Sequence, residues 1–288
     1  MSLVTTPEAR SPESAAHRRL TEPAVVRWVL TAITLLFLLL FLALPMGVVF
    51  VEAFRNGLGA YANAIKEPDA LAALKLTLIA AAVAVPLNML FGVCASWAIA
   101  KFEFRGKQLL TTFIDLPFAV SPVVSGLVFV LLFGRQGFLG PWVAENDIRI
   151  IFAVPGIVLA TIFVSLPFVV REVVPVLREV GDEQEQAAAT LGASGWQSFR
   201  RVTLPAIRWG LAYGIVLATA RALGEFGAVS VVSGKISGET ETLTLLVEKR
   251  FQNFDLAGAY AASALLAVLA LATLVTMTVI NNRREGSE

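Results

Sequence analysis

Six long apolar segments constrain this chain more than any other feature of its sequence. Each reaches the length of roughly 20 apolar residues that an α-helix needs to cross a bilayer. Charged residues make up only 16% of the chain, too few to cover a soluble domain of 288 residues. The sequence therefore predicts an all-α, polytopic membrane protein with six transmembrane helices, at residues 27–51, 71–100, 109–133, 150–174, 206–232 and 257–280.

The distribution of lysine and arginine predicts the orientation of these helices, because loops rich in both stay in the cytoplasm. Fourteen such residues fall on the side that carries both chain ends, and eight on the other side. We therefore expect both termini to be cytoplasmic. Residues 1–26 and 283–288 are then cytoplasmic tails, and residues 27–282 form one transmembrane domain.

The cytoplasmic loop between the fourth and fifth segments, at about residues 175–205, contains signals for two short helices. Asp182 followed by Glu185 is expected to cap the first helix, and Gly192 to end it in a left-handed conformation. The small residues Ala187–Ala189 would let a partner surface approach this helix closely.

The second helix of the loop is expected to begin at a capping box made by Ser194 and Gln197. Pro205 is expected to stop this helix and to open the fifth span. The predicted loop is therefore a helix, a sharp turn and a second helix across the cytoplasmic end of the bundle.

The same loop resembles the EAA motif of ABC importer permeases, which reads Glu-Ala-Ala, three residues, Gly, nine residues and Ile-x-Leu-Pro. Every spacing is kept here, in Gln186-Ala187-Ala188, Gly192 and Val202-Thr203-Leu204-Pro205. Gln186 stands where the family has Glu, so contact there should rest on shape and neutral hydrogen bonds more than on charge.

The resemblance implies that the loop fits a groove on an ATPase and passes nucleotide-driven closure to the membrane helices. The alternative is an ordinary amphipathic surface loop. The coupling residues that the resemblance implies are Glu185, Gln186, Ala187, Ala188, Gly192, Ala193, Ser194, Leu204 and Pro205.

Two further stretches, Asp115–Gly126 and Arg221–Gly234, resemble the sulfate and thiosulfate permeases of these importers, the CysT/CysW family, and more closely its W-type subunit. The shorter Gly-Glu-Phe-Gly core at residues 224–227 is also found in molybdate permeases. The resemblance implies a type I ABC importer permease fold in a bacterial inner membrane, and ATP-driven import of sulfate or thiosulfate by alternating access. A permease for another oxyanion, such as molybdate, stays an open alternative.

The same resemblance implies the partners of the chain. They are a second, CysT-like permease, two copies of a CysA-like ATPase and a periplasmic sulfate-binding protein, with membrane lipid around them and no nucleic acid. The chain has no P-loop, so ATP and Mg²⁺ would bind the partner ATPase, and the chain itself is neither an enzyme nor a cofactor protein.

The membrane segments contain few groups that could meet an anion. Arg221 and Glu225 are one helical turn apart and share a face, either as a structural pair that fixes helix packing or with Arg221 bordering the anion path. Hydroxyl groups could replace water around the anion, although membrane serines often bond to their own backbone. The candidate serines are Ser121, Ser125, Ser165, Ser230 and Ser233.

Two other classes of membrane protein fit the sequence less well. An intramembrane serine protease needs a serine and a histidine in its spans, but the single histidine, His17, lies in the predicted tail. An ion-coupled secondary transporter typically shows internal repeats and discontinuous helices. The sequence gives no sign of either feature, and such a transporter would leave the predicted docking loop unexplained.

Overall fold

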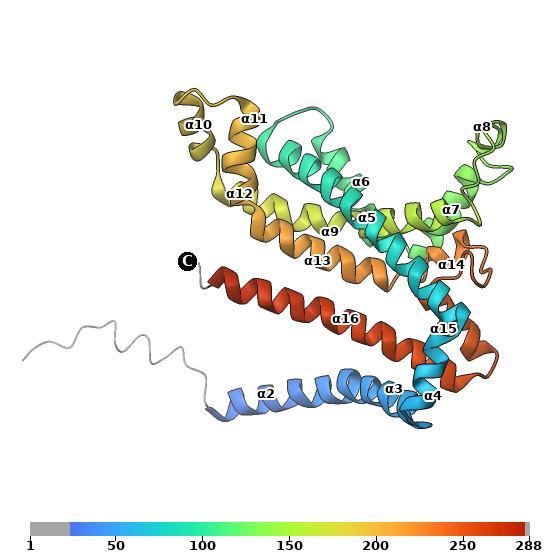
Figure 1. The fold of residues 1–288 in the computed structure, drawn as a ribbon. Coiled ribbons are helices and arrows are strands. Elements are labelled where there is room, and N and C mark those ends of the chain that lie inside the picture. Colours follow the sequence, from blue (N-terminus) through green and yellow to red (C-terminus); the bar gives the residue numbers. More distant parts are fainter. Residues whose placement is uncertain (1–23, 286–288) are drawn as a thin grey trace, which may run out of the picture. The chain divides into compact units, whose positions relative to one another are not determined.

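The computed structural model describes residues 24–285, and the regular elements in that range are all helices (Figure 1). The chain divides into two compact units, and the boundary between them in the sequence falls between Val49 and Phe50. The predicted tails lie largely outside the described residues. Of their residues, 24–26 belong to the first helix and 283–285 to the last.

The first predicted span is a single helical run from Val25 to Phe54, which begins in the first unit. It consists of α2 (Ala24–Leu38), the π-helix η1 (Leu39–Ala43) and α3 (Leu44–Phe54). Pro45 follows the π-helical turn by two residues and has no N–H to donate. The wider turn absorbs this missing hydrogen bond without ending the helix.

In the second unit, three long helices match three more of the predicted spans. They are α5 (Pro68–Lys101), α9 (Val154–Val180) and α16 (Leu256–Glu285), and each is long and apolar enough to cross a membrane. α9 continues six residues into the stretch expected to form the cytoplasmic loop, because Pro175 is accommodated inside the helix. Together with the first run, the structure therefore has four continuous candidate spans among its described residues.

The remaining two spans are bent, which corrects the expectation of uninterrupted helices. α6 (Lys107–Ala119) and α7 (Pro122–Phe133) meet at 115°. At the entrance to the fifth span, the run Gly195–Ala206, which lies in the expected cytoplasmic loop, meets α13 (Arg208–Leu223) at 68°. The first break has a local cause: Ser121 precedes Pro122, and proline disfavours a helical conformation in the residue before it. The expectation that the spans lack discontinuous helices is therefore wrong.

The fifth span also ends earlier than residue 232. α13 stops at Leu223, and a separate short helix, α14 (Val229–Val232), follows the stretch Gly224-Glu225-Phe226-Gly227. The carboxylate of Glu225 accepts a hydrogen bond from Ala228 N at 2.8 Å and so supports the restart of the helix. The short elements that complete the second unit are α4 (Gly57–Lys66), α8 (Gly140–Glu145), α10 (Glu183–Thr190), α11 (Gly195–Ser198), η2 (Phe199–Thr203), α12 (Leu204–Ala206) and α15 (Leu243–Gln252).

The core of the second unit forms where α5 and α13 pack against α9. Val169 of α9 is fully buried between two glycines. An added Cβ at Gly92 of α5 would come within 2.5 Å of its side chain, and one at Gly214 of α13 within 3.0 Å of its Cα. Small residues at these points let three membrane helices approach closely, as expected where lipid gives no hydrophobic drive for association.

Candidate functional site

The loop between α9 and α13, residues 181–206 and here called the coupling loop, folds into two short helical segments about Gly192. Gly192 has φ +84°, the left-handed conformation that the sequence predicts. Its N–H donates to Ala189 O at 3.0 Å, and Ala193 N donates to Ala188 O at 3.0 Å, which closes the C-terminus of α10. A Cβ at this position would meet no atom within 4 Å, so the need for glycine is conformational and not steric.

The second segment starts at the predicted capping box. Gln197 N donates to Ser194 Oγ at 3.3 Å, and Ser194 N donates to Gln197 Oε1 at 2.9 Å. Pro205 does not stop this segment, contrary to expectation. The π-helix η2 accommodates the proline, the helix continues to Ala206, and the bend follows at Ile207.

The first helix is held differently from the prediction. The side chain of Asp182 makes no capping hydrogen bond, because its carboxylate accepts from Lys101 Nζ at 2.6 Å. Glu185 pairs with the same ammonium at 3.3 Å and accepts a hydrogen bond from the hydroxyl of Thr203. Glu185 therefore does not replace the charge that Gln186 lacks on the exposed surface.

Small and apolar side chains are exposed around Gln186, and the acidic Glu183, one helical turn earlier, is exposed as well. Gln186, Ala187, Ser194 and Pro205 are exposed, and Ala188, Ala193 and Leu204 are half-buried. Two large apolar side chains that sequence reasoning did not select also lie here: Leu191 is 89% exposed and Trp196 is 69% exposed. Their position near Gly192 and Ser194 could have identified them from the sequence, because a large apolar side chain next to a turn suggests contact with a partner.

The second predicted site lies where the break between α6 and α7, at Ser121, meets the break between α13 and α14, at residues 224–228. Arg221 Nη1 is 2.7 Å from Glu225 Oε2, and the side chain of Glu225 is 2% exposed while that of Arg221 is 30% exposed. α7 packs on α14 beside this pair: Cβ atoms added at Gly126 and Gly227 would clash with Ala228 and Pro122. Gly126 and Gly227 thus bring the two breaks together.

The candidate serines are only partly gathered there. Ser121 is exposed at the start of α7 without a side-chain capping bond, whereas Ser125 donates to Ser121 O at 3.2 Å. Ser230 of α14 donates to Gly227 O at 2.8 Å. Ser165 lies apart in the contact of α9 with α5, where it accepts from Asn88 Nδ2 at 2.8 Å, and Ser233 donates to Thr240 O.

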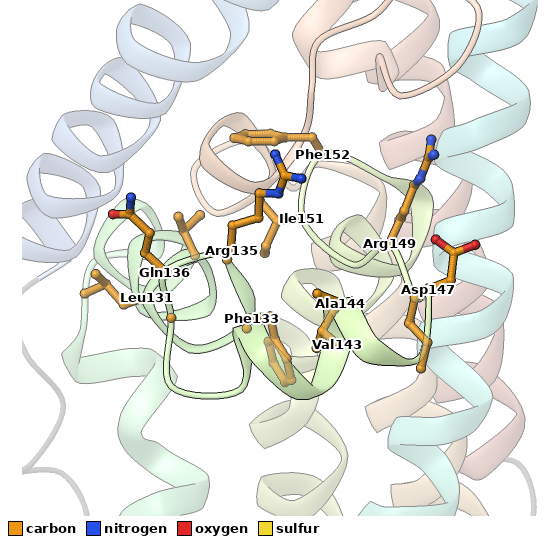
Figure 2. A pocket seen from close by; sticks show the side chains of 15 residues that line it. Leu131, Phe133, Arg135, Gln136, Val143, Ala144, Asp147, Arg149, Ile151 and Phe152 are labelled. Carbon is orange, nitrogen blue, oxygen red and sulfur yellow. The ribbon is translucent and has the colours of Figure 1, made fainter.

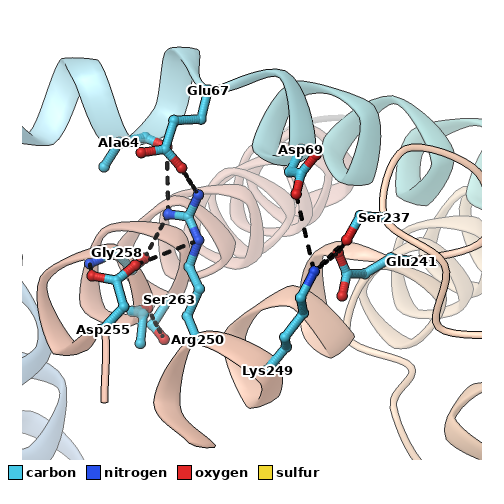
Figure 3. Close-up of polar contacts among 11 residues, drawn as sticks. Ala64, Glu67, Asp69, Ser237, Glu241, Lys249, Arg250, Asp255, Gly258 and Ser263 are labelled. Atoms are coloured by element: carbon cyan, nitrogen blue, oxygen red, sulfur yellow. Dashed lines mark hydrogen bonds and ion pairs between the residues drawn. The ribbon is translucent and has the colours of Figure 1, made fainter. Parts of the chain in front are cut away.

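A cation network that the sequence did not suggest joins α15 to the start of α5 and α16 (Figure 3). Arg250 is buried, pairs with Glu67 and lies 3.9 Å from Asp255, and its guanidinium also donates to two backbone carbonyls. The neighbouring Lys249 contacts Ser237 and lies 3.3 Å from Glu241. We call these residues the α15 network.

A cavity of about 860 Å³ lies between the end of α7, α8 and the connection to α9 (Figure 2). Arg135, Arg149 and Asp147 line it, and neither arginine takes part in an ion pair within residues 24–285. The described part of the chain has no group of three or more His, Cys, Asp or Glu residues that could hold a metal ion.

Comparison with known proteins gives a consistent result. Residues 88–286 match the family described as "Binding-protein-dependent transport system inner membrane component". The chain is 52% identical to the "Sulfate transport system permease protein CysW" of Synechocystis sp., over 90% of this chain and 94% of that protein. It is 42% identical to the CysT permease of Escherichia coli K12, over 86% and 88% of the two chains, so the W-type is the more similar of these two.

The fold also matches a solved structure. A bacterial ABC transporter involved in the import of the acidic polysaccharide alginate superposes with a TM-score of 0.74 and 20% identity, over 89% of this chain and 96% of that one. At this identity, the match shows that the two chains share a fold.

Proposed function

Because the chain belongs to the family of binding-protein-dependent transport system inner membrane components, we propose that it is the permease subunit of an ATP-driven importer for sulfate. It is a multi-pass inner-membrane protein and carries no ATPase domain. The observation that carries the proposal is the coupling loop, whose motif spacing, glycine turn and capping box coincide with the family match.

The proposed partners follow from this assignment. ATP and Mg²⁺ bind two copies of a partner ATPase, whose surface receives Leu191, Trp196 and the alanines of α10. A second, CysT-like permease completes the membrane pair, and a periplasmic binding protein delivers sulfate or thiosulfate. Residues 27–282 act as one transmembrane domain with both chain ends in the cytoplasm, which is the side that the excess of lysine and arginine favours.

The proposed mechanism is alternating access. Nucleotide-driven closure of the ATPase displaces the coupling loop, and the loaded binding protein acts on the opposite side of the same membrane helices. Each ligand binds one of two conformations better than the other, so both shift one equilibrium between inward-open and outward-open states.

The anion path is proposed to pass the two helix breaks. The N-terminus of α7 directs backbone N–H groups toward the break at Ser121, and such interrupted membrane helices favour anionic groups. Arg221, part-exposed near the second break, supplies a positive charge, while Ser121, Ser125 and Ser230 lie on the two elements that meet there. Ser165 and Ser233 support the path less well, because they bond to other parts of the fold.

Uptake by the reconstituted complex tests the function and its specificity. Vesicles with both permeases, the ATPase and the binding protein should take up labelled sulfate only when ATP is present. Competition with thiosulfate and molybdate ranks the three anions, and molybdate should compete least. Sulfate uptake by this chain without any ATPase would contradict the proposal.

A variant at Arg221 separates the path from the structural pair. Arg221→Ala leaves the buried carboxylate of Glu225 without its cation, so it should reduce assembly of the complex. Arg221→Ala with Glu225→Gln removes that unpaired charge and should restore assembly, measured by co-purification, while uptake stays about tenfold low, an effect of about 1.4 kcal/mol. Recovery of both assembly and uptake in the double variant would show that the pair is only structural.

A further inference from the structure

Lys101, the last residue of α5, lies under the coupling loop. Its ammonium is within reach of three oxygens: Gly181 O at 2.6 Å, Asp182 Oδ1 at 2.6 Å and Glu185 Oε2 at 3.3 Å. A lysine ammonium has three N–H donors and no acceptor, so these oxygens match its full capacity. All three come from one stretch at the start of the coupling loop, about eighty residues further along the chain.

This contact differs from a surface ion pair, which adds little because both side chains are solvated and mobile. The side chain of Lys101 is only 8% exposed, and a buried ammonium is unfavourable unless oxygens surround it. Glu185 extends the contact, since it also accepts from the buried hydroxyl of Thr203 in η2. The series Lys101, Glu185 and Thr203 therefore joins α5 to both helical segments of the loop.

An aromatic row makes a second connection from the same face of α5. Trp97 is one helical turn before Lys101, so the two side chains project from one side of the helix. The ring of Trp97 lies 5.1 Å from that of Phe199 in η2, and Phe199 stacks on the exposed Trp196 at 5.7 Å and 24°. A displacement of the exposed tip of the loop would thus reach α5 through packed rings.

The other end of α5 contacts α15. The hydroxyl of Thr77 accepts a hydrogen bond from Leu243 N, the first residue of α15, at 2.8 Å. Ala73 packs in one buried cluster with Leu243 and Leu246. α5 is a continuous helix of 34 residues with Pro86 accommodated inside it, so a single element connects the coupling loop with the elements at the opposite end of the unit (Figure 1).

We propose that Lys101 and Trp97 are positioning residues that clamp the coupling loop to α5, so that movement of the loop drives α5 and, through it, α15. The chain itself already joins the loop to α9 and α13, and the clamp adds α5 to the helices that move. This inference rests on the proposed function, because it takes the coupling loop as the site where the ATPase acts.

The test compares variants in the complete complex with both permeases, the ATPase and the binding protein. Lys101→Met removes the charge and keeps the side-chain length, and Lys101→Arg keeps the charge. Lys107→Met is the matched control: Lys107 is the first residue of the neighbouring helix α6, and its ion pair, with Glu103 at 2.6 Å, is local. For each complex the measurements are the amount of bound ATPase, the rate of ATP hydrolysis and the sulfate taken up per ATP hydrolysed.

We expect Lys101→Met to bind the ATPase and hydrolyse ATP within about twofold of wild type, but to lower uptake per ATP by about fivefold or more, the range for residues that couple two sites. Lys101→Arg should recover most of the loss, and Lys107→Met should show none. Wild-type uptake per ATP in the Lys101→Met complex would overturn the clamp and leave the proposed function intact. A wild-type complex that imports sulfate without ATP would instead overturn the proposed function.

If the Lys101→Met complex does not assemble, the sulfate taken up per ATP hydrolysed is measured in the Asp182→Asn complex instead. The Asp182 side chain is 59% exposed, so this substitution removes one of the two carboxylate charges at Lys101 without burying a new group. A lowered uptake per ATP in the assembled Asp182→Asn complex supports the clamp, and an unchanged ratio overturns it.

Discussion

The coupling loop takes its shape from contacts between residues close together in the sequence, whereas the α15 network joins residues that are far apart in it. The shape of the loop depends on Gly192 and on the Ser194–Gln197 capping box, whose hydrogen bonds join residues no more than five apart. In the α15 network, Arg250 bonds to Ala64, 186 residues earlier. A local motif sets the form of a docking element, whereas long-range ion pairs set the stability of the end where helices meet. Substitutions in the loop should therefore impair coupling, whereas substitutions in the network should unfold the protein.

The largest expected effect is at Gly192. Gly192→Val places a β-branched residue at φ +84°, at a cost of roughly 1–2 kcal/mol or more, so the two helical segments should reorient. Sulfate uptake should fall by about tenfold or more while the protein still inserts into the membrane.

Two controls define the Gly192 result. Gly192→Asn, which tolerates a left-handed conformation, should keep most of the uptake. Gly195→Ala adds a side chain to open space nearby, without a positive φ, and should be neutral. Normal uptake in Gly192→Val would contradict the importance of the turn.

In the α15 network, Arg250→Met should lower the stability of the protein. The Arg250 side chain is 7% exposed, and its removal leaves two carbonyls without their donor, at a cost of roughly 1–3 kcal/mol, while the exposed carboxylate of Glu67 is solvated again. Lys235 pairs with Glu248 of α15 at 2.9 Å and is 46% exposed, so Lys235→Met should cost about 1 kcal/mol or less. Thermal unfolding of the assembled complex in detergent measures both losses, and equal losses would remove the distinction between a buried and an exposed cation beside α15.

The smallest effect is expected at Gln186. Gln186→Glu restores the family residue on an exposed surface, where a single charge is worth less than about 1 kcal/mol. Uptake should therefore change by less than about fivefold. Glu185→Gln, one residue earlier, should lower uptake more, since it disturbs the contacts with Lys101 and Thr203. A larger effect at Gln186 than at Glu185 would place a charge-sensitive ATPase contact at position 186.

The helix breaks were not predicted from the sequence, although part of their signal is present in it. Pro122 and the glycines at 224 and 227 are visible in the sequence, and the preference of residues before proline could have located the first break. The length of the apolar run concealed it, because hydropathy sums over a window and does not register a change of direction. The pairing of the two breaks through Gly126 and Gly227 needed the packed structure, since close approach depends on which helices become neighbours.

The sequence by itself determined the class of fold, the positions of four membrane segments, and the glycine turn and capping box of the coupling loop. These follow from apolar length, from the φ preference of Gly192 and from capping residues that act within a few positions. Only the tertiary structure decided that Asp182 and Glu185 turn to Lys101, that Arg250 reaches Glu67, and that α5 connects the loop with α15. The physical reason is that a buried charge takes the partner that packing brings within reach, and in a helical membrane protein that partner is set by which helices lie side by side.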